Sequence, residues 1–557
     1  MVRQHWPIIL VLAATFLVYS NIFSNQFVGD DLDFIVHWPT IESFSNLKPV
    51  LLGTNPTEHI GTYRPLRNIF FMISYHFFGT NPFGYHTVSL TTHLLTTLLV
   101  YLIVRRLSPL SPLPALTALL FGLHPIHTEA VTFVTASYDS IGILFALTSF
   151  YLYLLSGQKR KTKNQLIAYY LSLNTGVLAL FTNEATLVLP LIISLHYYLY
   201  RLKKFTHPRQ FKPIFPYIIV AAAYLFIRTQ LVKILLRGTY QAGSFATTML
   251  TSLKAILEYL VTYLVPLNLS ISHTLPGGIS TYTFQRFNLT ALSSETAADP
   301  SIIITLLILL LLLGTAWFAR RRQPLVSFAI GTMLLGLLPV MNFIPTALIF
   351  SERYSYLSSV GFVLLLAWLI VEVSHLFSSS RPRTMYLVVA ILVIPLAAFY
   401  GYLTYHRNLD WSDEITFWHH EISTSPDNSI LYYQLGRVYQ SRSQLPEAVD
   451  AYSQAVAITP DFPEALTYMG QISLFLNNPQ SAAQYLSLAI QYDSENQFIR
   501  VNLAAAYSQI GDQQFASHHY SEAASAYDLA LQYYPTYQPA RVNLAQLCES
   551  KLINCGQ

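Results

Sequence analysis

The sequence predicts an all-α protein in which a multi-span membrane domain precedes an α-solenoid of paired helices. Apolar residues make up 53% of the 557 positions and charged residues only 11%, less than half the charged share of an ordinary soluble chain. The apolar residues come in long runs. Ser301–Phe318 carries no charge over 18 positions, enough to cross a hydrocarbon core as a helix. Beyond His406 these runs give way to a repeat of 34 residues.

Eleven apolar segments predict eleven membrane helices, because a backbone inside a bilayer must satisfy its own hydrogen bonds. They cover residues 7–23, 84–104, 111–123, 139–155, 165–182, 185–200, 213–230, 301–319, 324–341, 355–375 and 384–404. The first has a basic tip and no clear small-residue cleavage site, so we expect it to be retained. Leu253–Pro266 is expected to be re-entrant or interfacial, and a twelfth span there is the alternative.

Clusters of Lys and Arg fix the expected orientation of the spans. They lie at Arg3, 105–106, 158–163, 201–212, 320–322 and 380–383. Loops rich in these residues remain in the cytoplasm. If residues 231–300 form one external region, eleven spans place every cluster inside. The intervening acidic loops and the C-terminal part then lie outside.

The C-terminal part predicts tetratricopeptide repeats. Leu435-Gly436, Met469-Gly470 and Leu503-Ala504 are 34 positions apart, and Pro426 and Pro460 keep the same spacing. Small residues at fixed places with a closing Pro are typical of this repeat. Seven extra residues are expected around 516–522. Stacked helix pairs form a groove that binds polypeptides, so we expect protein partners there. The predicted domains are 1–406 and 407–557.

Twelve polar residues lie at external ends of the predicted spans. They are Asp30, Asp31, Asp33, Arg64, Arg67, His124, His127, Glu129, Asp139, Glu184, Glu352 and Arg353. Asp33 is expected to be structural. A carboxylate can take a proton from an incoming hydroxyl, and an arginine can bind a phosphate with two parallel hydrogen bonds. The set therefore suits chemistry on a lipid-linked phosphate. No Gly-rich phosphate loop or HExxH motif occurs, and nothing predicts a nucleic-acid partner or a cofactor.

Several segments, in order, resemble the TMTC-type transmembrane O-mannosyltransferases. They are F-V-G-D-D (27–31), T-Y-R-P-L-R (62–67), N-P-F-G-Y-H (81–86), L-F-G-L-H-P-I-H-T-E-A-V (120–131), S-E-R-Y-S-Y-L-S-S-V-G-F (351–362) and R-N-L-D-W-S-D-E (407–414). The wider resemblance is to the GT-C glycosyltransferases, whose first external loop carries an acidic pair. This sequence departs from the pattern of the animal TMTC proteins at Asp33 and at Tyr138-Asp139, and residues 231–300 match the family poorly.

The resemblance implies an inverting transfer of a sugar, usually mannose, from a polyprenyl phosphate to Ser or Thr hydroxyls. It implies that Asp30 is the base and Asp31 its acidic neighbour, with Glu129 and Asp139 orienting the base or the acceptor. Arg64 and Arg353 are the candidates for the lipid phosphate.

The remaining polar residues are secondary candidates with plainer explanations. His124 and His127 suggest a metal pair with Glu129, but a His-Pro at a span end is more often a helix start, so no metal is predicted. The plainer explanation of Glu184 is a favourable contact with a helix dipole. That of Glu352 is an ion pair with its neighbour Arg353.

Two further questions remain open on the sequence alone. The alternative function is a non-catalytic membrane anchor whose repeats act as a scaffold for envelope proteins. The two cysteines, Cys548 and Cys555, do not make a disulfide framework. We therefore expect a prokaryotic cytoplasmic membrane, with the endoplasmic reticulum as the alternative.

Overall fold

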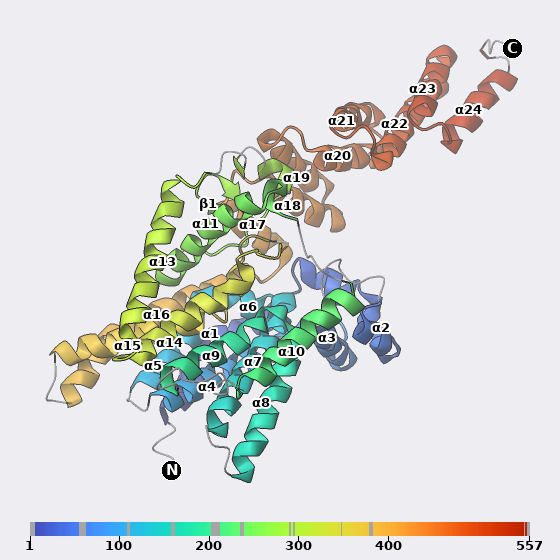
Figure 1. The fold of residues 1–557 in the computed structure, drawn as a ribbon. Helices are drawn as coiled ribbons and strands as arrows, with labels where there is room; N and C mark the ends of the chain where they lie inside the picture. The colour runs from blue at the N-terminus through green and yellow to red at the C-terminus, as the bar shows by residue number, and fades with distance from the viewer. Residues whose placement is uncertain are drawn as a thin grey trace. The chain divides into compact units, whose positions relative to one another are not determined.

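The computed structural model divides into two compact units, Met1–Phe417 and Trp418–Gln557 (Figure 1). It describes residues 6–54, 63–108, 112–157, 162–201, 212–233, 239–288, 291–292, 296–346, 348–377, 382–550 and 552–553. Several basic clusters of the expected orientation therefore lie wholly or partly outside the described residues: Arg3, 158–161, 202–211 and 380–381. Cys555 lies outside them as well.

Each of the eleven apolar segments contains a helix. These are α1 (Trp6–Tyr19), α4 (Pro82–Leu107), α5 (Leu113–Leu123), α7 (Val134–Ser156), α8 (Lys163–Thr182), α9 (Leu189–Tyr200), α10 (Phe215–Phe226), α13 (Pro300–Ala319), α14 (Pro324–Leu337), α15 (Ser359–Phe377) and α16 (Pro382–Asp410). Within the described residues, seven helical segments are long and apolar enough to span a membrane, and three shorter apolar ones accompany them. The protein is a multi-pass membrane protein, and the count of eleven spans stays a prediction.

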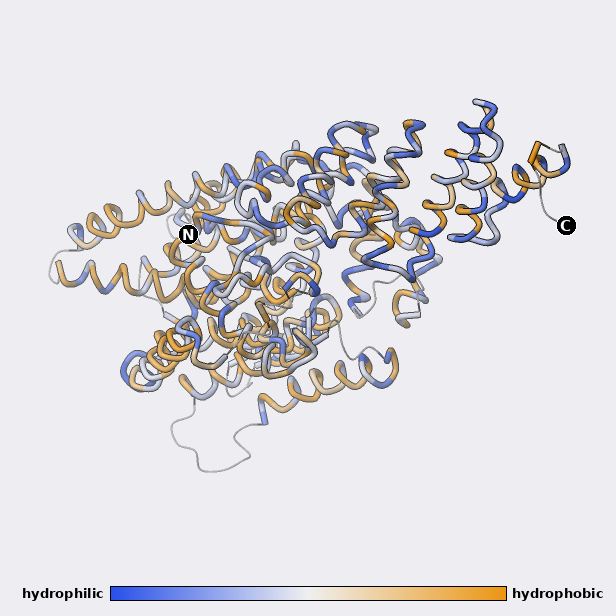
Figure 2. The backbone as a smooth tube through the Cα atoms, turned by 90° about the horizontal axis from the view of Figure 1, so that it is seen from above, coloured by the Kyte–Doolittle hydropathy of each residue, from blue (hydrophilic) through white to orange (hydrophobic). Residues whose placement is uncertain are grey.

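Hydropathy separates the two units (Figure 2). In the first unit, apolar residues run along most helices. The extreme case is α13, because only 11% of its most apolar 18-residue stretch is buried inside the protein. This exposure is expected for a helix that faces lipid. In the second unit, apolar and polar residues alternate along each helix, so each helix buries one face against its neighbours.

Proline marks the start of several helices in the first unit. Pro65, Pro82, Pro300 and Pro324 all occupy the first turn of a helix, where the missing N–H costs nothing. Pro65 begins α3 (Pro65–Phe78), which the sequence analysis did not single out. Its exposed face carries Phe77 and Phe78.

Residues 239–288 contain α11 (Phe245–Leu264) and a short β-hairpin. This helix is outside the set of candidate spans. Its Lys254 is fully buried and contacts Asp299 at 3.0 Å. Beyond it, β1 (Thr274–Leu275) and β2 (Ile279–Ser280) pair antiparallel, with Thr274 opposite Ser280. Short helical segments also belong to the first unit: η2 (Ser20–Ser24), η3 (Leu32–Val36), η4 (Pro39–Glu42), η5 (Phe44–Asn46), α2 (Leu47–Leu52), η6 (Pro125–His127), α6 (Thr128–Thr132), η7 (Glu184–Val188), η9 (Ile227–Leu231), η10 (Gln241–Gly243), η11 (Gln285–Asn288), η12 (Leu338–Val340) and η13 (Glu352–Ser355).

The second unit consists of antiparallel helix pairs. Its helices are α18 (Ser429–Ser441), α19 (Leu445–Ile458), α20 (Pro463–Phe475), α21 (Pro479–Tyr492), α22 (Gln497–Ala516), α23 (Tyr520–Tyr533) and α24 (Gln538–Glu549), preceded by α17 (Glu414–Thr424). One close contact recurs in each pair. A Cβ added to Gly436, Gly470 or Gly511 would lie 2.6, 2.6 or 2.5 Å from the large residue 16 positions later. The repeat therefore needs a residue without a side chain there.

The seven extra residues of the third repeat do not lie around 516–522 as expected. They lengthen α22, which has 20 residues where α20 has 13. The correction follows from helix geometry, because seven residues are close to two full turns and shift a helix face by only about 20°. Ala504 and Gly511, seven apart, are accordingly both buried. Gly511 is the true counterpart of Gly436 and Gly470.

Cys548, in α24, is disulfide-bonded. The number of cysteines therefore no longer argues for a prokaryotic cytoplasmic membrane over the endoplasmic reticulum, since a bonded cysteine is compatible with either external compartment.

The packing of α14 against α15 predicts a stability difference between two glycines. We expect Gly361→Ala to destabilise the first unit by about 1–3 kcal/mol, because the new Cβ would come closer than 3.0 Å to backbone atoms of Ala329 and Met333. Gly314→Ala in α13 is the control, since nothing lies within 4 Å of its Cβ position. Thermal unfolding of both variants in lipid would measure the difference, and equal melting temperatures would contradict this packing.

Candidate functional site

Arg64 joins three segments of the first unit that are far apart in the sequence. It precedes Pro65 at the start of α3, and its side chain is 4% exposed. Its guanidinium donates to both oxygens of Glu184, at 2.6 and 3.0 Å, and to Asp139 at 2.5 Å. Arg67, one turn later, contacts the other oxygen of Asp139 at 3.4 Å. Two arginines and two carboxylates thus neutralise one another, which burial requires.

Glu129 makes a second buried cluster with the Ser351–Arg353 segment. Its carboxylate accepts from the Ser351 hydroxyl at 2.7 and 3.0 Å and from the Arg353 backbone N–H at 3.0 Å. The Arg353 guanidinium lies 3.3 Å from the same carboxylate. Glu129 therefore fixes both the backbone and the side chain of Arg353, whereas the resemblance suggested that it orients the base or the acceptor.

A cavity connects the two clusters. Arg64, Asp139, Glu184, Arg353 and Tyr354 line it, and we call it the charged cavity. Burial opposes the positive charge of Arg353, but Glu129, Tyr354, Asp30 and Asp139 together raise its pKa above the usual value. Both arginines therefore remain cations, and an anion entering here would meet guanidinium groups already oriented by carboxylates.

Asp30 and Asp31 differ sharply in environment. Asp30 is exposed, and its charge acts on Arg353. Asp31 is 1% exposed and accepts hydrogen bonds from the Thr135 backbone N–H at 2.7 Å and from the Thr135 hydroxyl at 2.6 Å. Burial raises the pKa of Asp31 to about 7. Asp31 thus ties the first loop to the start of α7, whereas Asp30 is accessible to an incoming molecule.

His124 and His127 are buried among aromatic and backbone groups. His124 contacts the Tyr263 carbonyl at 3.1 Å and accepts from the Ile126 N–H at 3.2 Å. His127 contacts the Phe121 carbonyl at 2.8 Å and the Ser359 hydroxyl at 2.8 Å. All four ring nitrogens therefore already have a hydrogen-bonding partner within the protein. Within the described residues, no group of three His, Cys, Asp or Glu side chains comes together as metal ligands would.

The expected ion pair between Glu352 and Arg353 is replaced by two others, since Arg353 pairs with Glu129 and Glu352 pairs with His273. The sequence analysis missed this second cluster. His273 lies between two carboxylates, with Nδ1 3.2 Å from Glu258 and Nε2 3.0 Å from Glu352. Glu352 also accepts from the Ser270 N–H at 2.7 Å. We call this the His273 latch, because it fastens residues 270–273 to η13. No pattern around position 273 could have indicated it, since its partners lie 15 and 79 positions away.

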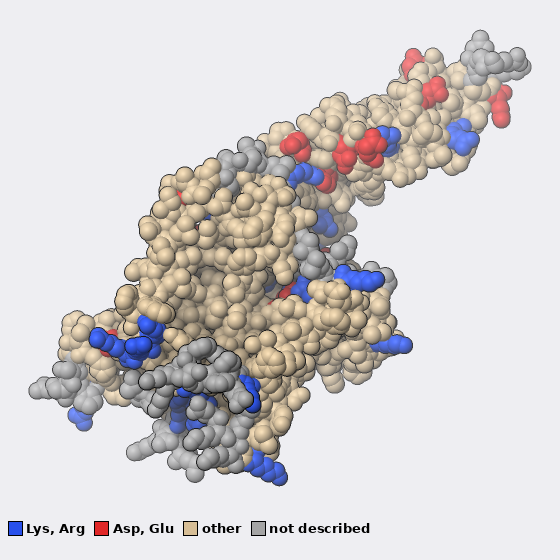
Figure 3. All heavy atoms as spheres, viewed as in Figure 1, with Lys and Arg blue, Asp and Glu red and all other residues tan. Residues whose placement is uncertain are grey.

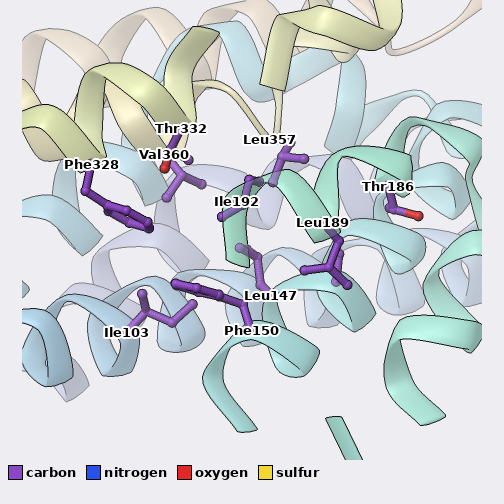
Figure 4. A pocket seen from close by; sticks show the side chains of 11 residues that line it. Ile103, Leu147, Phe150, Thr186, Leu189, Ile192, Phe328, Thr332, Leu357 and Val360 are labelled. Carbon is purple, nitrogen blue, oxygen red and sulfur yellow. The ribbon is translucent and has the colours of Figure 1, made fainter. Parts of the chain in front are cut away.

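Two apolar cavities adjoin the charged cavity. The inner one, shown in Figure 4, lies among transmembrane helices and is lined by residues such as Phe150, Ile192 and Phe328. It shares Leu357 with the charged cavity. The lateral one, of about 230 Å³, shares Glu184, Pro339 and Thr346 with the charged cavity. Its wall is apolar except for Glu184, Thr346 and Arg228, which is 9% exposed.

The His273 latch predicts a loss of stability in alkaline solution. Burial opposes the charge of His273, but Glu258 and Glu352 raise its pKa to about 9. Because the folded-state pKa is raised, the stabilisation is complete below about pH 6.5 and is lost as pH rises through 9, by at most about 3 kcal/mol. Thermal unfolding from pH 6 to 10 should show this step in the wild type and not in His273→Gln. Parallel curves for the two proteins would refute the latch.

Comparison with known proteins gives the following relatives. Residues 436–473 match the family model described as TPR repeat. The chain is 23% identical over 478 residues to "Protein O-mannosyl-transferase F38B6.6" of Caenorhabditis elegans, covering 82% of this chain and 63% of that protein. It is 22% identical to human "Protein O-mannosyl-transferase TMTC3", covering 86% of this chain and 54% of that one. Over a shorter stretch of 190 residues, identity to mouse "Protein O-mannosyl-transferase TMTC1" is 31%.

Among solved structures, the oligosaccharyltransferase of Archaeoglobus fulgidus aligns with 78% of this chain and 59% of its own, at a TM-score of 0.38 and 13% identity. A likeness this distant transfers no detail. The curated relatives are longer, so this chain spans 63% and 54% of the first two. The predicted resemblance is confirmed: the chain is similar, over most of its length, to proteins named as TMTC O-mannosyltransferases, and it carries a tetratricopeptide repeat.

Proposed function

We propose that this chain is an integral membrane glycosyltransferase that moves a sugar from a polyprenyl phosphate to Ser or Thr hydroxyls on the external face. Mannose is the sugar we propose, from the names of the relatives. The observation that carries the proposal is that the charged cavity shares lining residues with cavities whose walls are mostly apolar. A donor with a charged head and an isoprenoid tail needs this combination.

The charges of the cavities suit one phosphodiester. Of the residues that line the charged and lateral cavities, Arg64, Arg228 and Arg353 are cationic, and Asp139 and Glu184 are anionic. The excess is one positive charge, and a sugar phosphodiester carries one negative charge. The isoprenoid chain would leave through the lateral cavity, past Leu187, Leu191 and Phe343. Arginine suits the phosphate because its planar donors can bind two oxygens at once.

The chemical step is then a single displacement. The acceptor hydroxyl attacks the anomeric carbon, Asp30 takes the hydroxyl proton, and the bond between that carbon and the phosphate oxygen breaks. The leaving polyprenyl phosphate gains a second negative charge, which Arg353 and Arg64 would stabilise. Asp31 and Glu129 are positioning residues in this scheme. Asp31 holds the loop of Asp30 to Thr135, and Glu129 holds Arg353.

We place the charged cavity and the repeat unit, Trp418–Gln557, on the external face, where the repeat unit would recruit acceptor proteins. The distribution of charge fits this orientation. In Figure 3, Lys and Arg of the first unit are visible in its lower part and also at its right-hand edge, while acidic side chains are more frequent on the repeat unit.

The function is tested by sugar transfer from polyprenyl-phosphate mannose to a Ser/Thr-rich peptide, using purified protein in lipid. We expect Asp30→Asn to lower the transfer rate by about 100-fold or more, because it removes the general base. Asp33→Asn is the matched control, since Asp33 is a carboxylate of the same loop whose side chain is 68% exposed. It should change the rate by less than about two-fold.

Equal transfer by wild type and Asp30→Asn would remove Asp30 as the base. If the wild type transferred no sugar from any polyprenyl phosphate, the proposed activity would fail, and the membrane-anchored scaffold would be the better account.

A further inference from the structure

An uncharged cavity of about 250 Å³ lies beside the β1–β2 hairpin. Its polar lining comes from hydroxyl and amide side chains, including Thr239, Gln241, Thr283 and Asn288, and Phe284 supplies an aromatic face. Among the described residues that line it, none is ionisable. This composition contrasts with the charged cavity, and nothing in the proposed binding of the donor uses it.

The uncharged cavity meets the other cavities at one residue. Thr346 lines the charged, the lateral and the uncharged cavity. It is held by Asn342, whose side-chain oxygen accepts from the Thr346 N–H at 2.9 Å and from its hydroxyl at 2.6 Å. Asn342 itself has a left-handed backbone, with φ of 55°. The segment around Thr346 therefore separates an apolar side, with Phe343 and Ile344, from an uncharged polar side.

The walls of the uncharged cavity are fixed by side-chain hydrogen bonds. Asn288 accepts from the Ser280 N–H at 3.1 Å and donates to the Ser280 carbonyl at 2.7 Å. The Thr281 hydroxyl accepts from the His273 N–H at 2.9 Å. His273 in turn forms the latch to Glu352, the neighbour of Arg353. The cavity is thus attached to the same segment that positions Arg353.

We propose that the uncharged cavity is the acceptor subsite, which takes an extended, uncharged polypeptide segment and directs its Ser or Thr past Thr346 into the charged cavity. This proposal rests on the proposed function, and it names the class of acceptor. A charged side chain would lose its hydration here without gaining an ion pair. Backbone amides and hydroxyls would find donors and acceptors in the lining. Among the described lining residues, the phosphate of the donor would find no cation.

The test measures the binding of two fluorescent peptides to the full chain in lipid, without donor. One peptide is Ser/Thr-rich and free of ionisable side chains, and the other has Asp and Lys beside the same acceptor residue. We expect the uncharged peptide to bind at least about ten-fold more tightly. Thr283→Lys should weaken that binding by about ten-fold, because it places a bulky charge in the cavity.

Thr274→Lys is the matched control, because Thr274 is an exposed residue of the same hairpin and does not line the cavity. It should bind the uncharged peptide as the wild type does. In the transfer assay, Thr283→Lys should raise the KM for peptide and leave the KM for donor unchanged.

Equal binding of the two peptides, or equal weakening by Thr283→Lys and Thr274→Lys, would overturn the subsite. Absence of transfer by the wild type would instead count against the proposed function, and peptide binding would still decide the subsite.

Discussion

The pairing of Arg64 with Asp139 and Glu184 is the interaction on which the arrangement of the first unit's polar residues depends. It fastens the start of α3 to α7 and to η7. A buried charge is tolerated only with such partners, and removing one partner from a buried pair commonly costs about 3–5 kcal/mol. The cluster therefore holds the charged cavity in place, and it also presents an oriented guanidinium to whatever enters.

The cavities around this cluster differ in the polarity of the residues that line them. The lateral cavity is mostly apolar, the charged cavity carries Arg64 and Arg353, and the cavity beside the hairpin carries hydroxyl and amide groups. Thr346 lies where the three meet. These three environments suit the reaction proposed above, because a lipid-linked donor and a protein hydroxyl differ in charge and in affinity for water.

The two units use different physical means to specify their folds. Helices of the membrane unit are defined by hydropathy, and small residues such as Gly361 allow α14 and α15 to approach closely. The repeat unit instead depends on register, since each Gly faces a large residue 16 positions later. This explains how α22 accepts seven extra residues. Two added turns of helix lengthen the pair and leave the packing face almost unrotated.

The sequence by itself determined the all-α class, the apolar helices and the repeat, because hydropathy and periodicity are local properties of the chain. It also identified Arg64, Asp139, Glu184 and Arg353 as candidate site residues. Only the tertiary structure decided their partners and divided the roles of Asp30 and Asp31, one exposed and one bound to Thr135. It alone revealed His273, whose carboxylate partner Glu352 lies 79 positions away. Contacts over such distances depend on how helices pack, and no local pattern records them.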